Sequence, residues 1–169
     1  MVQRQLYLYE YIDAPFDDVA QVLASEGGDL FSDATAAAVE RADKVRAELV
    51  VDLGAFEIGR EVEIEVGEFD PVEVMRVKVP LRWKAAETAA LFPSLTADLE
   101  VAALAFHPPL TQVTIVGHYD PPLGVLGAAG DALFGHRVAE AAMHRFMHTV
   151  VARLTEAAAK VEHPEISRP

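Results

Sequence analysis

The stretch HYDPPLGVLGAAGDALFGHR, residues 118–137, joins the last strand-like segment of the chain to its longest helix-like segment. It begins with strand alternation, turns at two prolines, and then places glycines at 124, 127 and 130, where a helix should start. Three interpretations compete for these glycines: a phosphate-binding loop, a membrane insertion, and a helix start that packs closely on a neighbouring sheet. The rest of the chain decides among them.

Two of the three interpretations fail on the residues that surround the glycines. No Gly-Lys-Ser/Thr follows them, so they do not form a Walker loop. Their spacing is Gly-x-x-Gly-x-x-Gly without a βαβ unit, which excludes a dinucleotide fingerprint. Asp131 and the shortness of the apolar run exclude a membrane span. Small residues at helical spacing permit close backbone approach, so the sequence predicts a closely packed helix entry.

Length and composition limit the classes of function. A chain of 169 residues, 51% of them hydrophobic, fits a single domain over residues 1–169. The net charge of −13 offers no general attraction to nucleic acid or to anionic lipid. The lack of cysteine excludes disulfides and thiolate metal sites. No apolar run reaches the roughly 18 residues of a spanning helix, and the N-terminus has no signal-peptide pattern, so we expect a cytoplasmic protein.

The first third of the chain predicts a strand followed by short helices. Residues 2–12, VQRQLYLYEYI, have the composition of a strand. A short helix is predicted over residues 13–25, with Asp13 as its cap and Pro15 in its first turn. The segment EGGDLF, residues 26–31, is expected to end this helix, and a second short turn of helix is expected around residues 29–33.

From residue 47 the apolar period changes to two, which is typical of strands, and after the last strand a long helix is predicted from Leu123 to about Lys160. In one segment Met75, Val77, Val79, Leu81 and Trp83 are in phase, which predicts one buried face. The predicted strand segments are AELVVDL (47–53), FEIGREVEIEV (56–66), VEVMRVKVPLRWKA (72–85), LTADLEVAALAF (95–106) and TQVTIVGHYDPP (111–122).

Helices kept apart from a continuous run of strands indicate an α+β fold and not a parallel doubly wound sheet. A curved antiparallel sheet that wraps around the long C-terminal helix satisfies this order best. In the second strand segment the row Glu57, Glu61, Glu63 and Glu65 faces away from the apolar residues, as a solvated sheet face or as an acidic docking surface.

The chain resembles the START-like, or SRPBCC, superfamily, which has the helix-grip fold of the plant pollen allergen Bet v 1. The resemblance runs from end to end and rests on APFDDVAQVL (14–23), the turn GHYDPPLG (117–124) and the helix HRVAEA (136–141). Bacterial members are often labelled polyketide cyclase/dehydrase. The resemblance implies a deep, mainly apolar cavity between the sheet and the long helix, and it carries over no catalytic residue.

The histidines of the long helix are candidate metal ligands. Glu140, His144 and His148 are spaced four apart and share one face, which can supply ligands to zinc. The ligand set is incomplete, Arg137 adds a positive charge to the row, and Glu140 with His144 is an ordinary i,i+4 surface pair. We therefore expect no metal here and no cofactor elsewhere.

No nucleophile motif is present in the sequence, and the catalytic residues of any reaction stay unknown at this point. For acid–base chemistry the candidates are Arg82, His118, Tyr119 and Asp120, which could orient or protonate a carbonyl at a cavity rim. The alternative is that these residues only satisfy hydrogen-bonding groups of the turns. Strand alternation alone leaves open which face of the sheet lines the cavity.

The leading hypothesis is that the chain binds a hydrophobic small molecule, lipid-like or polyketide-like, without chemistry. A cyclase/aromatase-type enzyme and a regulatory docking module are the alternatives, and the ligand and the oligomeric state are open. Small residues and adaptable methionines on the helix predict unfilled volume opposite the sheet. The expected ligand-binding residues are Ile64, Met75, Val77, Trp83, Leu99, Val101, Ile115, Tyr119, Ala132, Met143 and Met147.

Overall fold

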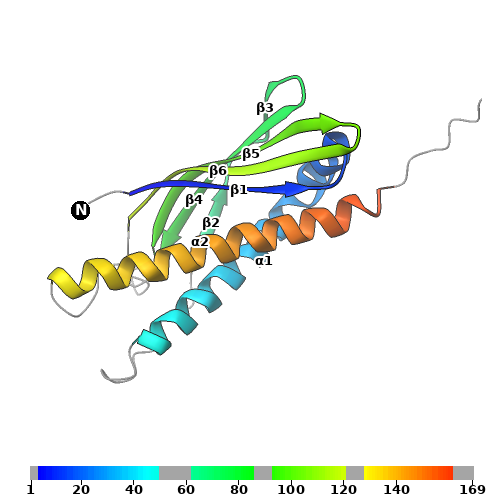
Figure 1. The fold of residues 1–169 in the computed structure, drawn as a ribbon. Coiled ribbons are helices and arrows are strands. Elements are labelled where there is room, and N and C mark those ends of the chain that lie inside the picture. Colours follow the sequence, from blue (N-terminus) through cyan, green and yellow to red (C-terminus); the bar gives the residue numbers. More distant parts are fainter. Residues whose placement is uncertain (1–3, 50–61, 86–92, 121–127, 162–169) are drawn as a thin grey trace, which may run out of the picture.

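The computed structural model describes residues 4–49, 62–85, 93–120 and 128–161, which form one antiparallel sheet with two long helices on one of its faces (Figure 1). Neither helix is long and apolar enough within the described residues to cross a membrane. In chain order the elements are β1 (Arg4–Ile12), α1 (Phe16–Leu49), β2 (Val62–Val66), β3 (Asp70–Glu73), β4 (Arg76–Ala85), β5 (Ser94–Phe106), β6 (Pro109–Asp120) and α2 (Ala128–Ala158).

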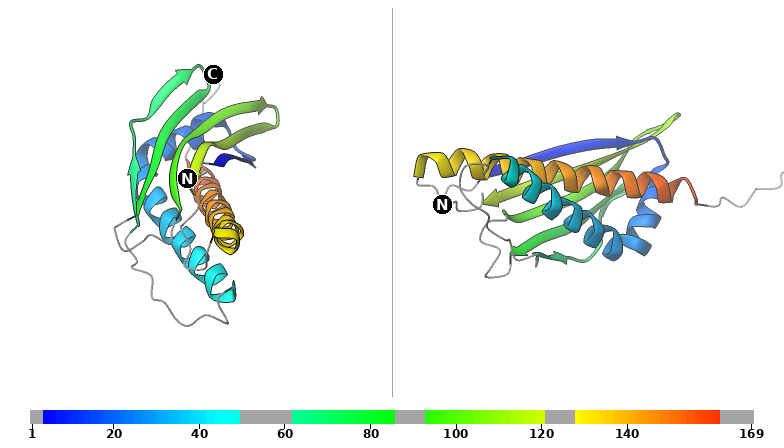
Figure 2. Two further views of the ribbon diagram at one scale, coloured as in Figure 1. Left: turned by 90° about the vertical axis from the view of Figure 1, so that its left-hand side faces the viewer. Right: turned by 90° about the horizontal axis from the view of Figure 1, so that it is seen from below.

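The described strands pair in the order β1-β6-β5-β4-β2, and β3 pairs with β4 as well. Every pairing is antiparallel. β5 and β6 form a long antiparallel hairpin. β1 and β2 therefore lie at opposite edges of the sheet, and the sheet curves around α2 (Figure 2).

The period-two pattern decides which face of the sheet is buried. Val77, Val79, Leu81 and Trp83 of β4 are all buried, as predicted from their phase. Met75 departs from this prediction because it lies in the turn between β3 and β4, where its backbone has a φ of 65°. On β5 the buried positions are Leu95, Ala97, Leu99 and Val101, and the residues between them lie on the outer face, which is turned away from the helices.

The predicted helix break at residues 26–31 and the predicted strand at residues 47–49 are both wrong. α1 continues from Phe16 to Leu49. Glycines cost a helix about 1 kcal/mol each, but burial of an apolar face supplies most of the stability of a helix in a protein. The buried stripe resumes on the far side of the glycine pair: Val19, Val22 and Leu23 precede it, and Leu30, Phe31, Ala34, Ala38 and Ala42 follow it.

The glycine pair does not end α1, but the helix is not straight. Figure 2 shows its first turns, in blue, pointing in a different direction from its later turns, in cyan. Gly27, Gly28 and the nearby Ser25 are the residue types at which helices bend, and the Ser25 hydroxyl donates to the carbonyl oxygens of Gln21 and Val22. The bend lets one helix follow the end of the sheet and then run beside α2.

Three aromatic side chains join the helices to the sheet at the centre of the core. Phe146 of α2 stacks on Phe31 of α1, with ring centroids 6.3 Å apart and an interplanar angle of 10°. Phe146 and Trp83 of β4 meet in a T-shaped arrangement, with ring centroids 5.2 Å apart and an interplanar angle of 83°. All three are fully buried. An exposed ion pair between Arg153 and Asp33 also links α2 to α1.

At Gly117 the strands β5 and β6 leave no room for a side chain. A Cβ atom at this position would lie 2.3 Å from the carbonyl oxygen of Thr96 and 2.5 Å from the Cα of Ala97. Real Cβ atoms are not found this close to backbone atoms, so only glycine fits. The close approach predicted at Gly124 and Gly127 lies outside the described residues, as do the predicted strand residues 50–61 and the first turn of the predicted C-terminal helix.

Candidate functional site: the groove between α1 and β2

An open groove with a volume of about 860 Å³ lies between the middle of α1 and the edge strand β2. Drug-sized and cofactor-sized ligands occupy pockets of about 300–1,000 Å³, so the groove is large enough for a small organic molecule. Its lining is Gly28, Ser32, Thr35, Ala36, Val39 and Glu40 from α1, with Val62, Ile64, Glu65 and Val66 from β2.

Small side chains on α1 keep this groove open. Gly28, Ser32 and Ala36 follow one another at intervals of four residues, so they lie above one another on one face of the helix. None of them reaches far enough to close the gap to the sheet, and a Cβ added to Gly28 would meet no atom within 4 Å. On the opposite wall Val62 and Ile64 of β2 are half-buried and supply apolar surface.

Two carboxylates give the groove its charge. Glu40 of α1 forms an exposed ion pair with Lys44, at 2.6 Å between carboxylate oxygen and ammonium nitrogen. The hydrogen bond from Lys44 and its positive charge lower the pKa of Glu40 below its usual value, so Glu40 is ionised at neutral pH. Glu65 of β2 is exposed at the other wall. A cation thus stands beside Glu40, and Glu65 lies opposite Arg82 in the strand register.

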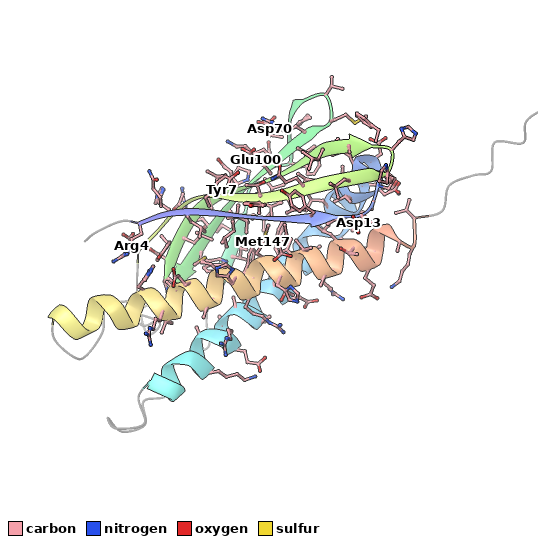
Figure 3. All side chains as sticks on the ribbon, viewed as in Figure 1. Arg4, Tyr7, Asp13, Asp70, Glu100 and Met147 are labelled. Carbon is pink, nitrogen blue, oxygen red and sulfur yellow. The ribbon has the colours of Figure 1, made fainter. Side chains whose placement is uncertain are left out.

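The residues expected to line a cavity under α2 occupy several different places. Ile64 lines the groove, whereas Met75 lies half-buried in the β3–β4 turn. Ala132 is not among the residues whose side chains the structure describes. The other eight are in the packed core: Val77, Trp83, Leu99, Val101, Ile115, Tyr119, Met143 and Met147, the last lying between α2 and the sheet (Figure 3). Their role in ligand binding stays a prediction.

A second polar cluster lies at the opposite side of the sheet, where β6 meets α2. The hydroxyl of Tyr119 is 2.8 Å from Nδ1 of His136, and Nε2 of His136 is 3.1 Å from a carboxylate oxygen of Glu140. The carboxylate can only accept, so Nε2 carries a proton, and in neutral His136 Nδ1 then accepts the hydrogen bond from Tyr119. The two rings are nearly parallel, at 6°. We name Tyr119, His136 and Glu140 the tyrosine–histidine cluster.

Burial shapes the chemistry of this cluster. Tyr119 is almost fully buried, and its burial raises the pKa of its phenol above the usual value. The negative charge of Glu140 raises this pKa further, and the positive charge of Arg4 opposes the increase. Tyr119 is therefore held as a neutral hydrogen-bond donor at neutral pH.

We expect Tyr119→Phe to remove the last part of the alkaline tyrosinate titration. The raised pKa means that the folded chain keeps a proton which the unfolded chain loses near pH 10, so this contribution to stability is complete below about pH 10 and is lost as the pH rises through the folded value. Ultraviolet absorbance of the folded protein measures the titration. Tyr9→Phe, which changes an exposed tyrosine, should keep the absorbance change at the highest pH. If this change also remained in Tyr119→Phe, the assignment of the raised pKa to Tyr119 would be wrong.

The acid–base candidates predicted from the sequence do not form one constellation. Tyr119 faces the interior, whereas Arg82 and His118 lie on the outer face, on either side of Thr96 in the strand register. Arg82 and His118 contribute to a shallow cleft of about 390 Å³ on that face. Asp120 accepts a hydrogen bond from the hydroxyl of exposed Ser94 at 3.3 Å. The partner that the sequence missed is His136.

The exposed row on α2 also differs from its prediction. Glu140 pairs with His136, four residues before it, and not with His144, four residues after it. Among the described side chains no group of three histidine or carboxylate residues is placed to hold a metal ion. The absence of a metal at Glu140, His144 and His148 stays a prediction.

Comparisons with known proteins concern the fold. No protein-family model matches the chain, and no curated protein matches it either. The Zhui aromatase/cyclase from Streptomyces sp. R1128 matches in structure at 16% identity, over 94% of this chain and 95% of that chain, with a TM-score of 0.40. A protein from Thermus thermophilus matches at 12% identity, over 92% and 97% of the two chains, with a TM-score of 0.39. A protein from Mycobacterium smegmatis matches at 12% identity, over 94% and 93%, with a TM-score of 0.36.

The described elements themselves establish the architecture, because the curved antiparallel sheet wraps around the long C-terminal helix α2 (Figure 2). The chain has a helix-grip fold. The α+β class predicted from the sequence is thus confirmed, and so is the predicted sheet wrapped around the C-terminal helix. At these identities the likeness says nothing of ligand or activity.

Proposed function

We propose that this helix-grip protein binds a neutral, hydrophobic small molecule in the groove between α1 and β2. The observation that carries the proposal is the volume of about 860 Å³ bounded by small residues on one wall and by Val62 and Ile64 on the other. Elsewhere in the described interior, aromatic contacts such as Phe146 with Trp83 fill the space between helix and sheet. The groove is thus the place where a guest meets apolar surface without displacing the core.

The charges of the groove select the kind of ligand. Glu40 and Glu65 line its two walls, and the whole chain carries a net charge of −13. Although Lys44 pairs with Glu40, the net negative charge of the chain opposes the approach of an anion, such as a fatty acid carboxylate, and favours a neutral molecule of similar shape. The hydroxyl of Thr35 already donates to the carbonyl oxygen of Phe31 at 2.8 Å, so its proton is not offered to a ligand.

Binding without chemistry fits this groove better than a cyclase/aromatase-type reaction. The tyrosine–histidine cluster involves β6, beside the edge strand β1, whereas the groove is at the other edge of the sheet, on β2. A reaction that used Tyr119 would need its substrate far from the groove. The regulatory docking alternative rested on a row of four glutamates, of which only Glu65 has a described side chain.

The neutral dye Nile red tests the proposal, and we expect it to bind at a single site per chain. Ala36→Phe fills the groove from the α1 side and should weaken binding by about tenfold or more, which corresponds to about 1.4 kcal/mol. Ala24→Phe is the matched control, since Ala24 is also exposed on α1 but does not line the groove. Fluorescence titration measures binding, and circular dichroism verifies that both variants fold.

The same titration with an anionic dye of similar size tests the charge argument. We expect weaker binding of the anion at low ionic strength, with the difference shrinking as salt screens the carboxylates. Equal binding of Nile red by Ala36→Phe and by the unsubstituted protein, with both folded, would show that the groove is not the binding site.

A further inference from the structure

Three tyrosines form a row on the outer face of β1. Tyr7, Tyr9 and Tyr11 are 63%, 52% and 50% exposed, and the ring centroids of successive members are 6.0 and 5.7 Å apart. The facing residues on β6 are Val116, Thr114 and Gln112, which carry no charge. The whole chain has a net charge of −13, yet this part of its surface is aromatic and uncharged. Exposed apolar surfaces of this kind often mark interaction sites.

The row lies on a strand at the edge of the described sheet. Among the described strands β1 pairs with β6 alone, over nine consecutive residues from Arg4 to Ile12, with no shift in register. Natural edge strands are protected from further pairing by prolines, bulges, short length or lysines, and β1 has no proline and no lysine. The backbone groups on its outer edge have no partner strand among the described residues, so this edge can pair with another strand.

The charges within β1 indicate what that strand is. The strand has one cation, Arg4, and one anion, Glu10, and both stand on the face opposite to the tyrosine row (Figure 3 labels Arg4 and Tyr7). Neither forms an ion pair with any other described residue. Because Arg4 and Glu10 are placed symmetrically about Tyr7, an antiparallel copy of the same strand, centred on Tyr7, sets each Arg4 opposite a Glu10.

We propose that two copies of this chain associate through antiparallel pairing of their β1 strands about a two-fold axis at Tyr7. The two sheets then become one continuous sheet, and the interface is isologous, as in most homodimers. In this register Arg4 faces Glu10 twice, Leu6 faces Leu8 twice, and the two Tyr7 side chains meet on the outer face. Pairs of opposite charge, of apolar residues and of aromatic residues each stabilise facing strands.

Other registers that keep the two faces of the sheet are less complementary. Centring the pair on Leu8 sets Leu6 opposite Glu10 and Arg4 opposite Ile12. Centring it on Tyr9 sets Leu8 opposite Glu10 and leaves Arg4 beyond the paired strand. The register at Tyr7 alone among these three gives both charges a partner, which opposes the general repulsion between two acidic chains.

Charge reversal with rescue tests the interface and its register together. We expect the full chain to sediment as a dimer, and Arg4→Glu and Glu10→Arg each to raise the dissociation constant by about tenfold or more. The double variant Arg4→Glu/Glu10→Arg should restore association, because the pairs re-form with exchanged sign. Arg41→Glu and Glu26→Arg, exposed on α1, are controls with the same change in net charge and should leave the dimer unchanged.

Analytical ultracentrifugation at constant ionic strength measures each constant. Tyr7→Lys, an exposed substitution that sets two cations against each other at the axis, should also produce a monomer. If the unsubstituted chain is a monomer, the proposal is wrong, and the tyrosine row would bind a partner other than a second copy. If the chain is a dimer that these substitutions do not change, the interface lies elsewhere on the molecule. The β1 edge lies across the sheet from the groove, so these variants leave binding of Nile red intact.

Discussion

Phe146→Ala is expected to lower the free energy of unfolding by about 3–5 kcal/mol, the usual cost of removing a fully buried phenylalanine. Phe146 is 0% exposed and contacts an aromatic ring of the other helix, Phe31 of α1, and one of the sheet, Trp83 of β4. Its removal leaves a cavity that large neighbouring rings cannot fill without changing rotamer. The same substitution loosens α1 from α2 and α2 from the sheet.

Urea denaturation measures this loss, and Phe106→Ala is the matched control. Phe106 lies at the end of β5 and is 63% exposed, so its truncation should change the free energy of unfolding by no more than about 0.5 kcal/mol. Equal losses in the two variants would mean that Phe146 does not occupy the centre of the core.

Gly117→Ala is expected to cost about 3 kcal/mol or more, at the upper end of the effects of overpacking. The added methyl group would overlap the backbone of β5, at Thr96 and Ala97, and not a side chain that can turn aside. To remove this overlap, the two strands of the β5–β6 hairpin must separate at this point. Their separation also disturbs Tyr119, two residues later. We expect a lower midpoint of thermal unfolding and faster amide hydrogen exchange in β5 and β6.

A glycine-to-alanine substitution in α1 should have the opposite effect on the free energy of unfolding. Gly28→Ala adds a methyl group where no atom lies within 4 Å, and alanine is a better helix former by about 1 kcal/mol. The variant is expected to be more stable by up to that amount. A destabilised Gly28→Ala would indicate that the bend of α1 depends on this glycine, and an unaffected Gly117→Ala would contradict the close approach of the strands.

Sequence patterns predicted the sheet well because each strand carries its own period. The alternation in β4 correctly predicted that Val77, Val79, Leu81 and Trp83 are buried. α1 was predicted too short because its continuity depends on burial against distant elements. Gly27 and Gly28 look locally like a helix end, and only the packing of Phe31 on Phe146, 115 positions later in the chain, shows why the helix continues.

The candidate sites show the same limit. The spacing of Gly28, Ser32 and Ala36 is visible in the sequence, but the expected break at residues 26–31 concealed that they share one helix face. The pair His136 and Glu140 stands at the i,i+4 spacing that sequence inspection can detect. The contact of His136 with Tyr119 could not be found this way, since it joins a strand to a helix across the turn.

The two faces of α1 have different consequences for how this protein can change. Leu30, Phe31, Ala34 and Ala38 face the core, while Gly28, Ser32 and Ala36 of the same turns face the groove. Mutations on the groove side can therefore accumulate with little effect on folding, and natural drift or directed evolution can change the ligand preference of this scaffold. Thermal shift assays of a library randomised at Ser32 and Ala36 would show many variants near the parental melting temperature.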